Sequence, residues 1–187
     1  MAPSVFLTRK MAQEAIDTLI AEGFHVEVWP DEMPPPRQVL LEKAHEADAL
    51  ITLVTDRVDE ELLINAPNLK VVANMAVGFD NFDVTAATNH GVVLSNTPKI
   101  LTKTTADLTF ALLLAAARRV VEGDRHVRQG KWKTWHPQFY LGQDVHEKIL
   151  GIIGLGQIGL EVGKRAMGFD MQVLYHDPVR NSQAEQR

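Results

Sequence analysis

The sequence predicts an α/β fold in two parts, an open parallel sheet over residues 1–97 and the first part of a second α/β domain over residues 98–187. Two observations predict this fold. Short apolar runs alternate with segments of helical period, which is typical of β-α repeats joined by right-handed crossovers. Further along, a glycine-rich turn stands between another apolar run and another helical pattern, which begins a second β-α unit.

The first part alternates strands and helices in regular order. Gly23 supplies a left-handed end for the first helix, and Pro67 ends the third. The run at 69–77 is apolar almost throughout, as in a strand whose two faces are both covered. The pattern predicts strands at 4–8, 25–29, 49–54, 69–77 and 92–96, with helices at 11–22, 37–47, 58–66 and 84–90. Together these elements predict an open sheet of flavodoxin-like type.

A long helix opens the second part. Thr104 and Asp107 stand at capping-box spacing, which predicts a helix that begins there and runs to Gly130. Between Phe110 and Ala117 the helix is apolar on every side, so it must be covered all round. We expect a second domain or a second subunit to supply part of that cover.

The turn "GLGQIG" at 154–159 follows a predicted strand at 149–153 and precedes a helix. This order is typical of a dinucleotide-binding loop: Gly154 makes the tight turn, Gly156 lets the backbone approach a pyrophosphate, and Gly159 lets the helix pack on the strand. The pyrophosphate would sit on the helix N-terminus. A purely structural glycine turn is the alternative interpretation.

Asp177 ends the next predicted strand, at 171–177, eighteen residues after Gly159. That distance is close to the roughly 20 residues at which an acidic side chain takes the adenosine ribose hydroxyls. A carboxylate there repels the 2′-phosphate of NADP and favours NAD, although Arg180 lies near enough to weaken the preference. An aspartate before Pro178 is also a common turn residue.

A second candidate site lies in "MAVGFDNFDVTAA" at 75–87. Gly78 falls just past the carboxyl end of a buried strand, where open α/β sheets bind ligands, and its N–H could meet an anionic group. The simpler roles here are an N-cap for Asp83 and a turn-stabilising side chain for Asn81.

Composition excludes several classes of function. The net charge is −5, with 19 basic and 24 acidic residues mixed along the chain, so no basic patch is available for nucleic acid. The chain has no cysteine, which excludes disulfides and Cys-ligated metals, and none of its seven histidines stands at metal-ligand spacing. No apolar run approaches the roughly 20 residues that span a bilayer, and the N-terminus has too short an apolar run for a signal peptide. We expect a cytoplasmic protein without a membrane or metal site.

Aromatic residues gather in a loop-like stretch after the long helix. Trp132, Trp135 and Phe139 stand in "GKWKTWHPQFYLG". They fit either a hydrophobic plug between domains or an aromatic wall of an active site, including that of a partner subunit.

Together the motifs resemble the D-isomer-specific 2-hydroxyacid dehydrogenase family. The segments "VANMAVGFDNFDVTAATNHGVVLSNTP", "LTKTTADLTFALLLAAARRVVEGDRHVRQGKWKTWHPQFYLG" and "GIIGLGQIG" are similar to its glyoxylate/hydroxypyruvate reductase branch, and the resemblance covers essentially all of the chain. It implies a flavodoxin-like substrate domain at 1–97. It also implies that 98–187 hold a dimerisation helix and the N-terminal part of a Rossmann NAD(P) domain, within a homodimer.

The resemblance also implies roles for individual residues. Val77 and Gly78 match the loop that holds the substrate carboxylate through backbone N–H groups, and Trp135 matches an aromatic residue that reaches into the neighbouring subunit's active site. The positions implied to contact the cofactor are Thr105, Gly154, Leu155, Gly156, Gln157, Ile158, Gly159, Asp177, Pro178 and Val179.

The implied activity is hydride transfer between a nicotinamide cofactor and a small 2-oxo or 2-hydroxy acid such as glyoxylate or hydroxypyruvate. The family's catalytic arginine, glutamate and histidine come from later segments, and no residue here matches them, so we expect the chain to stop inside its second domain. The alternatives are a non-catalytic dimerisation or nucleotide-sensing module, or another branch of the family that acts on phosphoglycerate or formate.

We therefore predict that the 187-residue chain alone does not reduce glyoxylate or hydroxypyruvate. Positioned acid catalysis typically contributes about 10²–10⁴-fold, and the expected donor has no match in this sequence. NADH oxidation followed by absorbance tests this, and turnover at the level of a complete dehydrogenase would contradict it.

Overall fold

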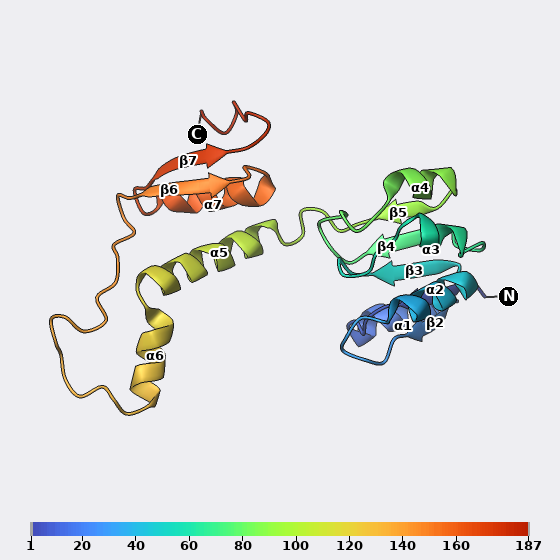
Figure 1. The fold of residues 1–187 in the computed structure, drawn as a ribbon, viewed down its shortest axis with the longest axis horizontal. Coiled ribbons are helices and arrows are strands. Elements are labelled where there is room, and N and C mark those ends of the chain that lie inside the picture. The colour runs from blue at the N-terminus through green and yellow to red at the C-terminus, as the bar shows by residue number, and fades with distance from the viewer. Residues whose placement is uncertain (1, 187) are drawn as a thin grey trace. The chain divides into compact units, whose positions relative to one another are not determined.

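The computed structural model describes residues 2–186, which form two compact units, Met1–Pro98 and Lys99–Arg187. Figure 1 draws the first unit in blue to green and the second in green to red. Each unit has its own sheet and its own hydrophobic core. They are described separately below.

The first unit is built on five parallel strands in the order β2-β1-β3-β4-β5. This is the flavodoxin-like strand order, so the predicted α/β fold is confirmed. The register pairs Val5 with Val26 on one side of β1 and with Ala49 on the other. Each strand is shorter than its predicted run, because the residues at the ends turn into loops. The bounds are β1 Ser4–Leu7, β2 His25–Val28, β3 Ala49–Thr52, β4 Val71–Asn74 and β5 Val93–Ser95.

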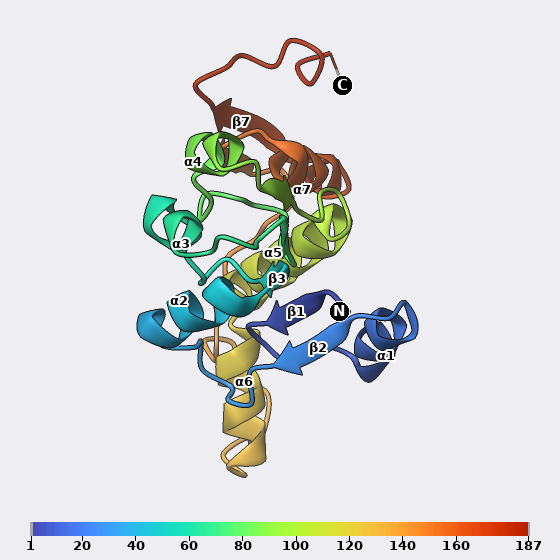
Figure 2. The same cartoon turned by 90° about the vertical axis from the view of Figure 1, so that its right-hand side faces the viewer.

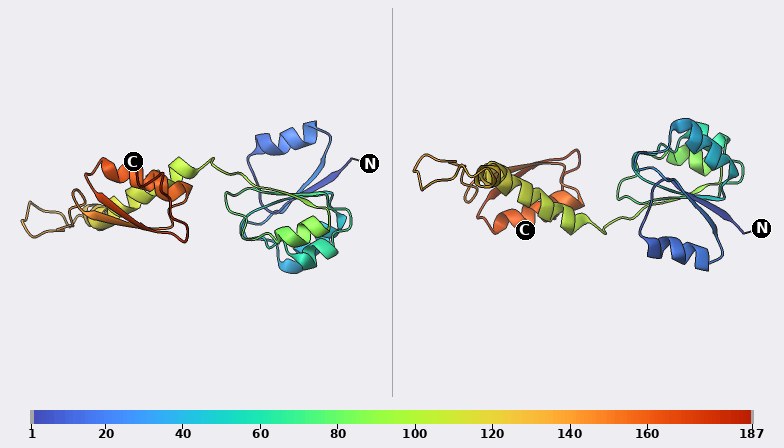
Figure 3. Two further views of the ribbon diagram at one scale, coloured as in Figure 1. Left: turned by 90° about the horizontal axis from the view of Figure 1, so that it is seen from above. Right: turned by 90° about the horizontal axis from the view of Figure 1, so that it is seen from below.

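Helices cover both faces of this sheet. In Figure 3, α1 (Gln13–Ala21, blue) lies on one face, and α2 (Arg37–Glu46), α3 (Glu60–Ile64) and α4 (Val84–Asn89) lie on the other. Figure 2 shows α1 beside the edge formed by β1 and β2. Successive residues of β1 alternate accordingly, since Val5 and Leu7 pack with α1 and Phe6 packs with the larger group of helices.

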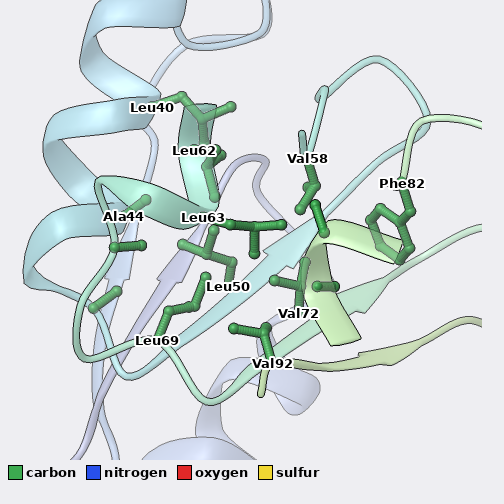
Figure 4. Packing of buried hydrophobic residues seen from close by; sticks show 14 of the residues in the cluster. Leu40, Ala44, Leu50, Val58, Leu62, Leu63, Leu69, Val72, Phe82 and Val92 are labelled. Carbon is green, nitrogen blue, oxygen red and sulfur yellow. The ribbon is translucent and has the colours of Figure 1, made fainter. Parts of the chain in front are cut away.

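The larger core lies between the sheet and α2–α4 (Figure 4). Leu50 and Val72 project from the central strands and are fully buried against Leu62. Burying one such side chain contributes roughly 1.5–3 kcal/mol, which fixes the position of the strands. At the start of α4 the Asp83 carboxylate accepts a hydrogen bond from Ala86 N at 2.8 Å, so the predicted N-cap is confirmed.

Over its described residues, the second unit contains two parallel strands and three helices. Helix α7 packs between the strands and α5, where Val162 and Ala166 join Ala106 and Phe110 in one core. Phe110 also stacks on Phe169 with ring centroids 5.3 Å apart. The elements are α5 Thr102–Ala117, α6 Val120–Arg128, β6 Ile149–Ile153, α7 Gln157–Met167 and β7 Gln172–His176.

The predicted single helix from Thr104 to Gly130 is wrong. It is broken between α5 and α6, where Arg119 has a φ of +54°. The Ala117 carbonyl oxygen leaves the helical pattern and accepts a hydrogen bond from Gln143 N at 2.8 Å. A Cβ on Gly142 would lie 2.5 Å from that oxygen, so glycine is required where the returning chain crosses the break.

The predicted capping box is also wrong. Helix α5 begins at Thr102, before Thr104, and its N-cap Leu101 makes no side-chain hydrogen bond. Asp107 instead accepts a hydrogen bond from Arg165 Nε at 2.7 Å. The Asp107 carboxylate, which the spacing predicted to cap the helix, therefore forms an ion pair between α5 and α7.

Candidate functional site

The glycine-rich turn joins β6 to α7. Gly154 has a φ of +90°, a conformation that side chains rarely adopt, and it donates from its N–H to His176 C=O at 2.8 Å. A Cβ on Gly159 would lie 2.3 Å from the Gly154 carbonyl oxygen, so only glycine allows α7 to come this close. At Gly156, in contrast, no heavy atom of the described chain would lie within 4 Å of a Cβ.

The structure thus has the tight turn and the close helix–strand contact that the sequence predicts at this loop. Gln157 and Ile158 form the first turn of α7, whose leading N–H groups have no partner within the helix. The open space at Gly156 and the positive end of α7 suit a bound anion. Binding of a pyrophosphate there stays a prediction.

Asp177 ties the end of β7 to this loop. Its Oδ2 accepts a hydrogen bond from Leu155 N at 2.7 Å, and its Oδ1 accepts one from Val179 N at 3.0 Å. The two N–H donors, that of Val179 first, lower the pKa of the Asp177 carboxyl below its usual value, so the group is ionised at neutral pH. The carboxylate therefore both fixes the loop and places a negative charge beside it. Pro178 and Val179 follow it as exposed residues.

Thr105 lies in the first part of α5, which α7 holds in place. The Arg165 guanidinium donates to Asp107 Oδ1 and to the Lys103 carbonyl oxygen, and it also donates to Glu161 within α7. The Asp107 hydrogen bond contributes most to raising the pKa of Arg165. These contacts fix the turn of α5 that carries Thr105 relative to the helix that carries the glycine loop.

The second candidate loop follows β4 in the first unit. Its three consecutive carbonyl oxygens all accept hydrogen bonds. Ala76 O accepts from Thr97 N at 2.8 Å and from Thr97 Oγ1 at 3.0 Å. Val77 O accepts from Asn96 Nδ2 at 2.8 Å, and Gly78 O accepts from Asn74 Nδ2 at 3.1 Å. The N–H groups of Val77 and Gly78 make no hydrogen bond to another residue of 2–186. Two adjacent free N–H groups at the carboxyl end of a strand can bind a carboxylate.

A network of polar side chains supports this loop from below. Asn74 is almost fully buried, and its Nδ2 also donates to Asn81 Oδ1 at 3.1 Å. The Asn81 amide in turn donates to Asp56 O at 2.8 Å and to Leu53 O at 3.3 Å. The buried Asp56 carboxylate accepts from Thr8 Oγ1 and from Leu53 N. The chain of hydrogen bonds joins the carboxyl ends of β1, β3 and β4.

Trp135 is the most exposed of the aromatic residues after α6, with 90% of its surface accessible. Within its own unit it does not form a plug. Phe139 and Tyr140 pack instead on His126 of α6, with ring centroids 4.6 and 5.2 Å away, and Tyr140 lies under the Arg119 guanidinium. The segment is anchored at its end while Trp135 projects into solvent.

Two requirements bear on residues 2–186, those of a membrane-spanning helix and those of a metal-ligating cluster. None of the helices there combines the length and apolar character needed to cross a membrane. The same residues contain no group of three or more histidine, aspartate or glutamate side chains that could hold a metal ion.

The model of the D-isomer specific 2-hydroxyacid dehydrogenase catalytic domain matches residues 5–174. The chain belongs to this family. Among curated members, a glyoxylate reductase of Pyrococcus horikoshii is 52% identical over 189 residues, which cover 99% of this chain and 56% of that protein. A glyoxylate reductase of Thermococcus litoralis is 51% identical over 190 residues, and the match covers 100% of this chain and 57% of that protein.

A solved protein of Thermus thermophilus has the same fold, with a TM-score of 0.89 and 44% identity over 96% of this chain and 57% of that chain. The chain thus spans little more than half the length of the 2-hydroxyacid dehydrogenase relatives that it matches.

Sequence reasoning missed the residues that shape the loop at Val77 and Gly78 in this family member. Asn74 interrupts the apolar run at 69–77, and a polar residue inside a buried strand was the signal that could have found it. Asn96 and Thr97 carry no comparable signal, because only the neighbouring positions of β4 and β5 bring them to the loop.

We predict opposite effects of alanine at two glycines of α7. Gly159→Ala should lower the free energy of unfolding by about 1–3 kcal/mol, because its Cβ would overlap the Gly154 carbonyl. Gly163→Ala should be neutral or stabilising by up to about 1 kcal/mol, because its Cβ would make ordinary contacts at 3.7 and 3.9 Å. Urea unfolding of the two variants checks this, and equal effects would contradict the packing described.

We also predict that Asn81→Ala loosens the loop at Val77 and Gly78. Losing its three hydrogen bonds in a partly buried network should cost about 2–3 kcal/mol of unfolding free energy and speed amide hydrogen exchange at Met75 and Thr97, whose N–H groups donate to Thr52 O and Ala76 O beside the loop. Asn65→Ala is the matched control, since the Asn65 side chain donates to Glu61 O at the surface, away from this network. If exchange at Met75 and Thr97 is unchanged, the network does not position the loop.

Proposed function

We propose that this chain forms the carboxylate-binding unit and the first part of the dinucleotide-binding unit of a reductase that acts on small 2-oxo acids with NAD(P)H. Membership of the 2-hydroxyacid dehydrogenase family supports the proposal, as does the similarity to glyoxylate reductases. We infer glyoxylate or hydroxypyruvate as the substrate. The observation that carries the proposal is that each unit leaves N–H groups open to an anion at the carboxyl end of a strand.

The residues of the second unit fit a dinucleotide. Space is open where a Gly156 Cβ would stand, and closed at Gly159 by the chain itself, as close approach of a pyrophosphate to the backbone requires. We assign the pyrophosphate to Gly154–Gly159 and the adenosine ribose to Asp177, Pro178 and Val179. We also assign a cofactor contact to Thr105 of α5. When bound, the nicotinamide supplies the hydride for the carbonyl carbon of the substrate.

In the first unit, Val77 and Gly78 hold the substrate carboxylate through their N–H groups. The carbonyl oxygens of the same two peptide groups, Ala76 O and Val77 O, already accept from Thr97 and Asn96, so these peptide planes cannot turn to point an oxygen at the anion. This fixed orientation removes a reorganisation cost on binding. We assign the proton donor to no residue of this chain.

The test is NADH binding by calorimetry. Gly156→Val should weaken binding at least about tenfold by filling the pyrophosphate space, while leaving the melting temperature close to that of the unmodified chain. Failure of the unmodified chain to bind NADH at millimolar concentration would refute the proposed function.

We further propose that the site prefers NADH to NADPH because the ionised Asp177 opposes a 2′-phosphate. Asp177→Ser should reduce or reverse the preference, measured as the ratio of the two dissociation constants. The serine variant also loses the bonds to Leu155 and Val179, so the NADH constant is compared alongside the ratio. A clear NADPH preference in the unmodified chain would contradict the assignment.

We propose that the chain pairs with a second copy through α5, α6 and the segment that carries Trp135. Leu108 and Leu112 of α5 are 58% and 62% exposed, and Val120, Val121 and Val127 of α6 are exposed as well. Exposed apolar surface gains about 25 cal/mol per Å² when it is covered. In such a pair, Trp135 would reach the active site of the other copy.

Leu112→Glu should therefore shift the chain from dimer to monomer, because it places a charge in the proposed contact. Ile64→Glu, at an equally exposed position of α3, is the control and should leave the dimer intact. Sedimentation equilibrium over a concentration series measures both. A folded monomer throughout that range in the unmodified chain would refute the interface.

A further inference from the structure

A cluster of polar side chains lies just after the nucleotide loop's acidic residue, in the segment that follows β7. Arg180 donates from Nε to both oxygens of Glu185, at 3.0 and 3.1 Å, and from Nη2 to Glu185 Oε2 at 2.7 Å. One edge of the guanidinium is thus turned toward a single carboxylate. Such two-point contact fixes the direction of an arginine more firmly than a single bond does.

Tyr175 of β7 positions Glu185 for this contact. The Tyr175 hydroxyl donates to Glu185 Oε1 at 2.7 Å and accepts from Asn181 N at 3.0 Å. Asn181 in turn accepts a hydrogen bond from Ala184 N at 3.1 Å through its Oδ1, which folds the intervening turn. Arg180, with Tyr175 second, lowers the pKa of Glu185 to about 2, so the carboxylate is charged at neutral pH.

Arg180 follows the residue proposed to bind the adenosine ribose of the cofactor. It lies three residues after Asp177, whose side chain accepts from Val179 N and from Leu155 N of the glycine loop. In dinucleotide sites, an arginine near the acidic ribose-binding residue is the group that accommodates the 2′-phosphate of NADP. Here one two-donor edge of the guanidinium, formed by Nε and Nη2, is taken by Glu185, and the Glu185 charge lies beside the rest of the group.

We propose that Glu185 is a cofactor-specificity residue, which holds Arg180 away from the 2′-phosphate position and so strengthens the preference for NAD that Asp177 sets. The inference rests on the proposed dinucleotide function of this loop. Glu185 acts in two ways: it occupies the Nε and Nη2 edge of the guanidinium, and its own charge repels a phosphate that approaches Arg180. Tyr175 supports it as a positioning residue.

The effect should be moderate, because the ion pair is near the surface. The Arg180 side chain is 79% exposed and that of Glu185 is 32% exposed. An exposed pair of this kind competes with a ligand only weakly. We therefore expect loss of Glu185 to tighten NADPH binding by about 3- to 10-fold and to change NADH binding by less than about twofold.

The experiment compares dissociation constants for NADH and NADPH by calorimetry at low and moderate salt. Glu185→Ala should tighten NADPH binding, Glu185→Gln should have a smaller effect because its amide oxygen still accepts from Arg180, and Glu185→Ala combined with Arg180→Gln should lose the gain. The matched control is Glu61→Ala, which removes the carboxylate of another exposed arginine pair, with Arg37 at 2.7 Å in the first unit. It should leave both constants unchanged.

A second measurement needs no cofactor. In the unmodified chain the Arg180 Nε–H should exchange slowly with solvent by NMR, and in Glu185→Ala it should exchange as fast as in a free side chain. Fast exchange in the unmodified chain would overturn the restraint itself. If NADH binds and the NADPH constant is the same with and without Glu185, the specificity role is refuted while the proposed function stands. If neither dinucleotide binds, both fall.

Discussion

At the carboxyl ends of parallel strands, backbone N–H and C=O groups need hydrogen-bond partners that the sheet no longer supplies. The geometry of both candidate sites depends on which of these groups this chain pairs and which it leaves open. Buried peptide groups that lack a partner are costly, so each strand end recruits side chains. In the first unit the amides of Asn74 and Asn96 take the carbonyl groups of the loop. In the second, the Asp177 carboxylate takes the N–H of Leu155. The N–H groups that remain without a partner among residues 2–186 are those of Val77 and Gly78 in the first unit and those of the first turn of α7 in the second.

The two units reach this result by different means. The second unit uses glycine and the end of a helix: Gly154 turns the chain, Gly159 admits α7, and the first turn of α7 presents its N–H groups. The first unit uses no helix at the loop itself. There a chain of hydrogen bonds from Thr8 through Asp56 and Asn81 to Asn74 fixes the peptide planes from within. A substitution in this network would therefore change the loop without touching any ligand.

The sequence predicts the parallel sheet well because apolar runs and helical periods are local, strong signals that the core confirms. Gly154 and Gly159 are predictable for the same reason, since their roles follow from a short motif with a fixed order. The break at Arg119 is not predictable in this way. No proline or glycine marks it, and its cause is the hydrogen bond to Gln143 from a segment distant in sequence. The capping role predicted for Asp107 is wrong for a similar reason, because its partner Arg165 lies on another helix.

The crossing at Gly142 has a consequence for how the chain tolerates change. Within the second unit, residues 118–142 form an excursion that begins after Ala117 and ends before Gln143, and a backbone hydrogen bond of 2.8 Å joins these two residues. Because this hydrogen bond closes the two ends of residues 118–142, the segment between them can change in length at small entropic cost while the ends keep their geometry. The glycine-rich turn at 154–159 and α7 lie outside residues 118–142. Recombination or loop grafting at this junction could exchange residues 118–142 as a whole between relatives, provided that a glycine is kept at position 142.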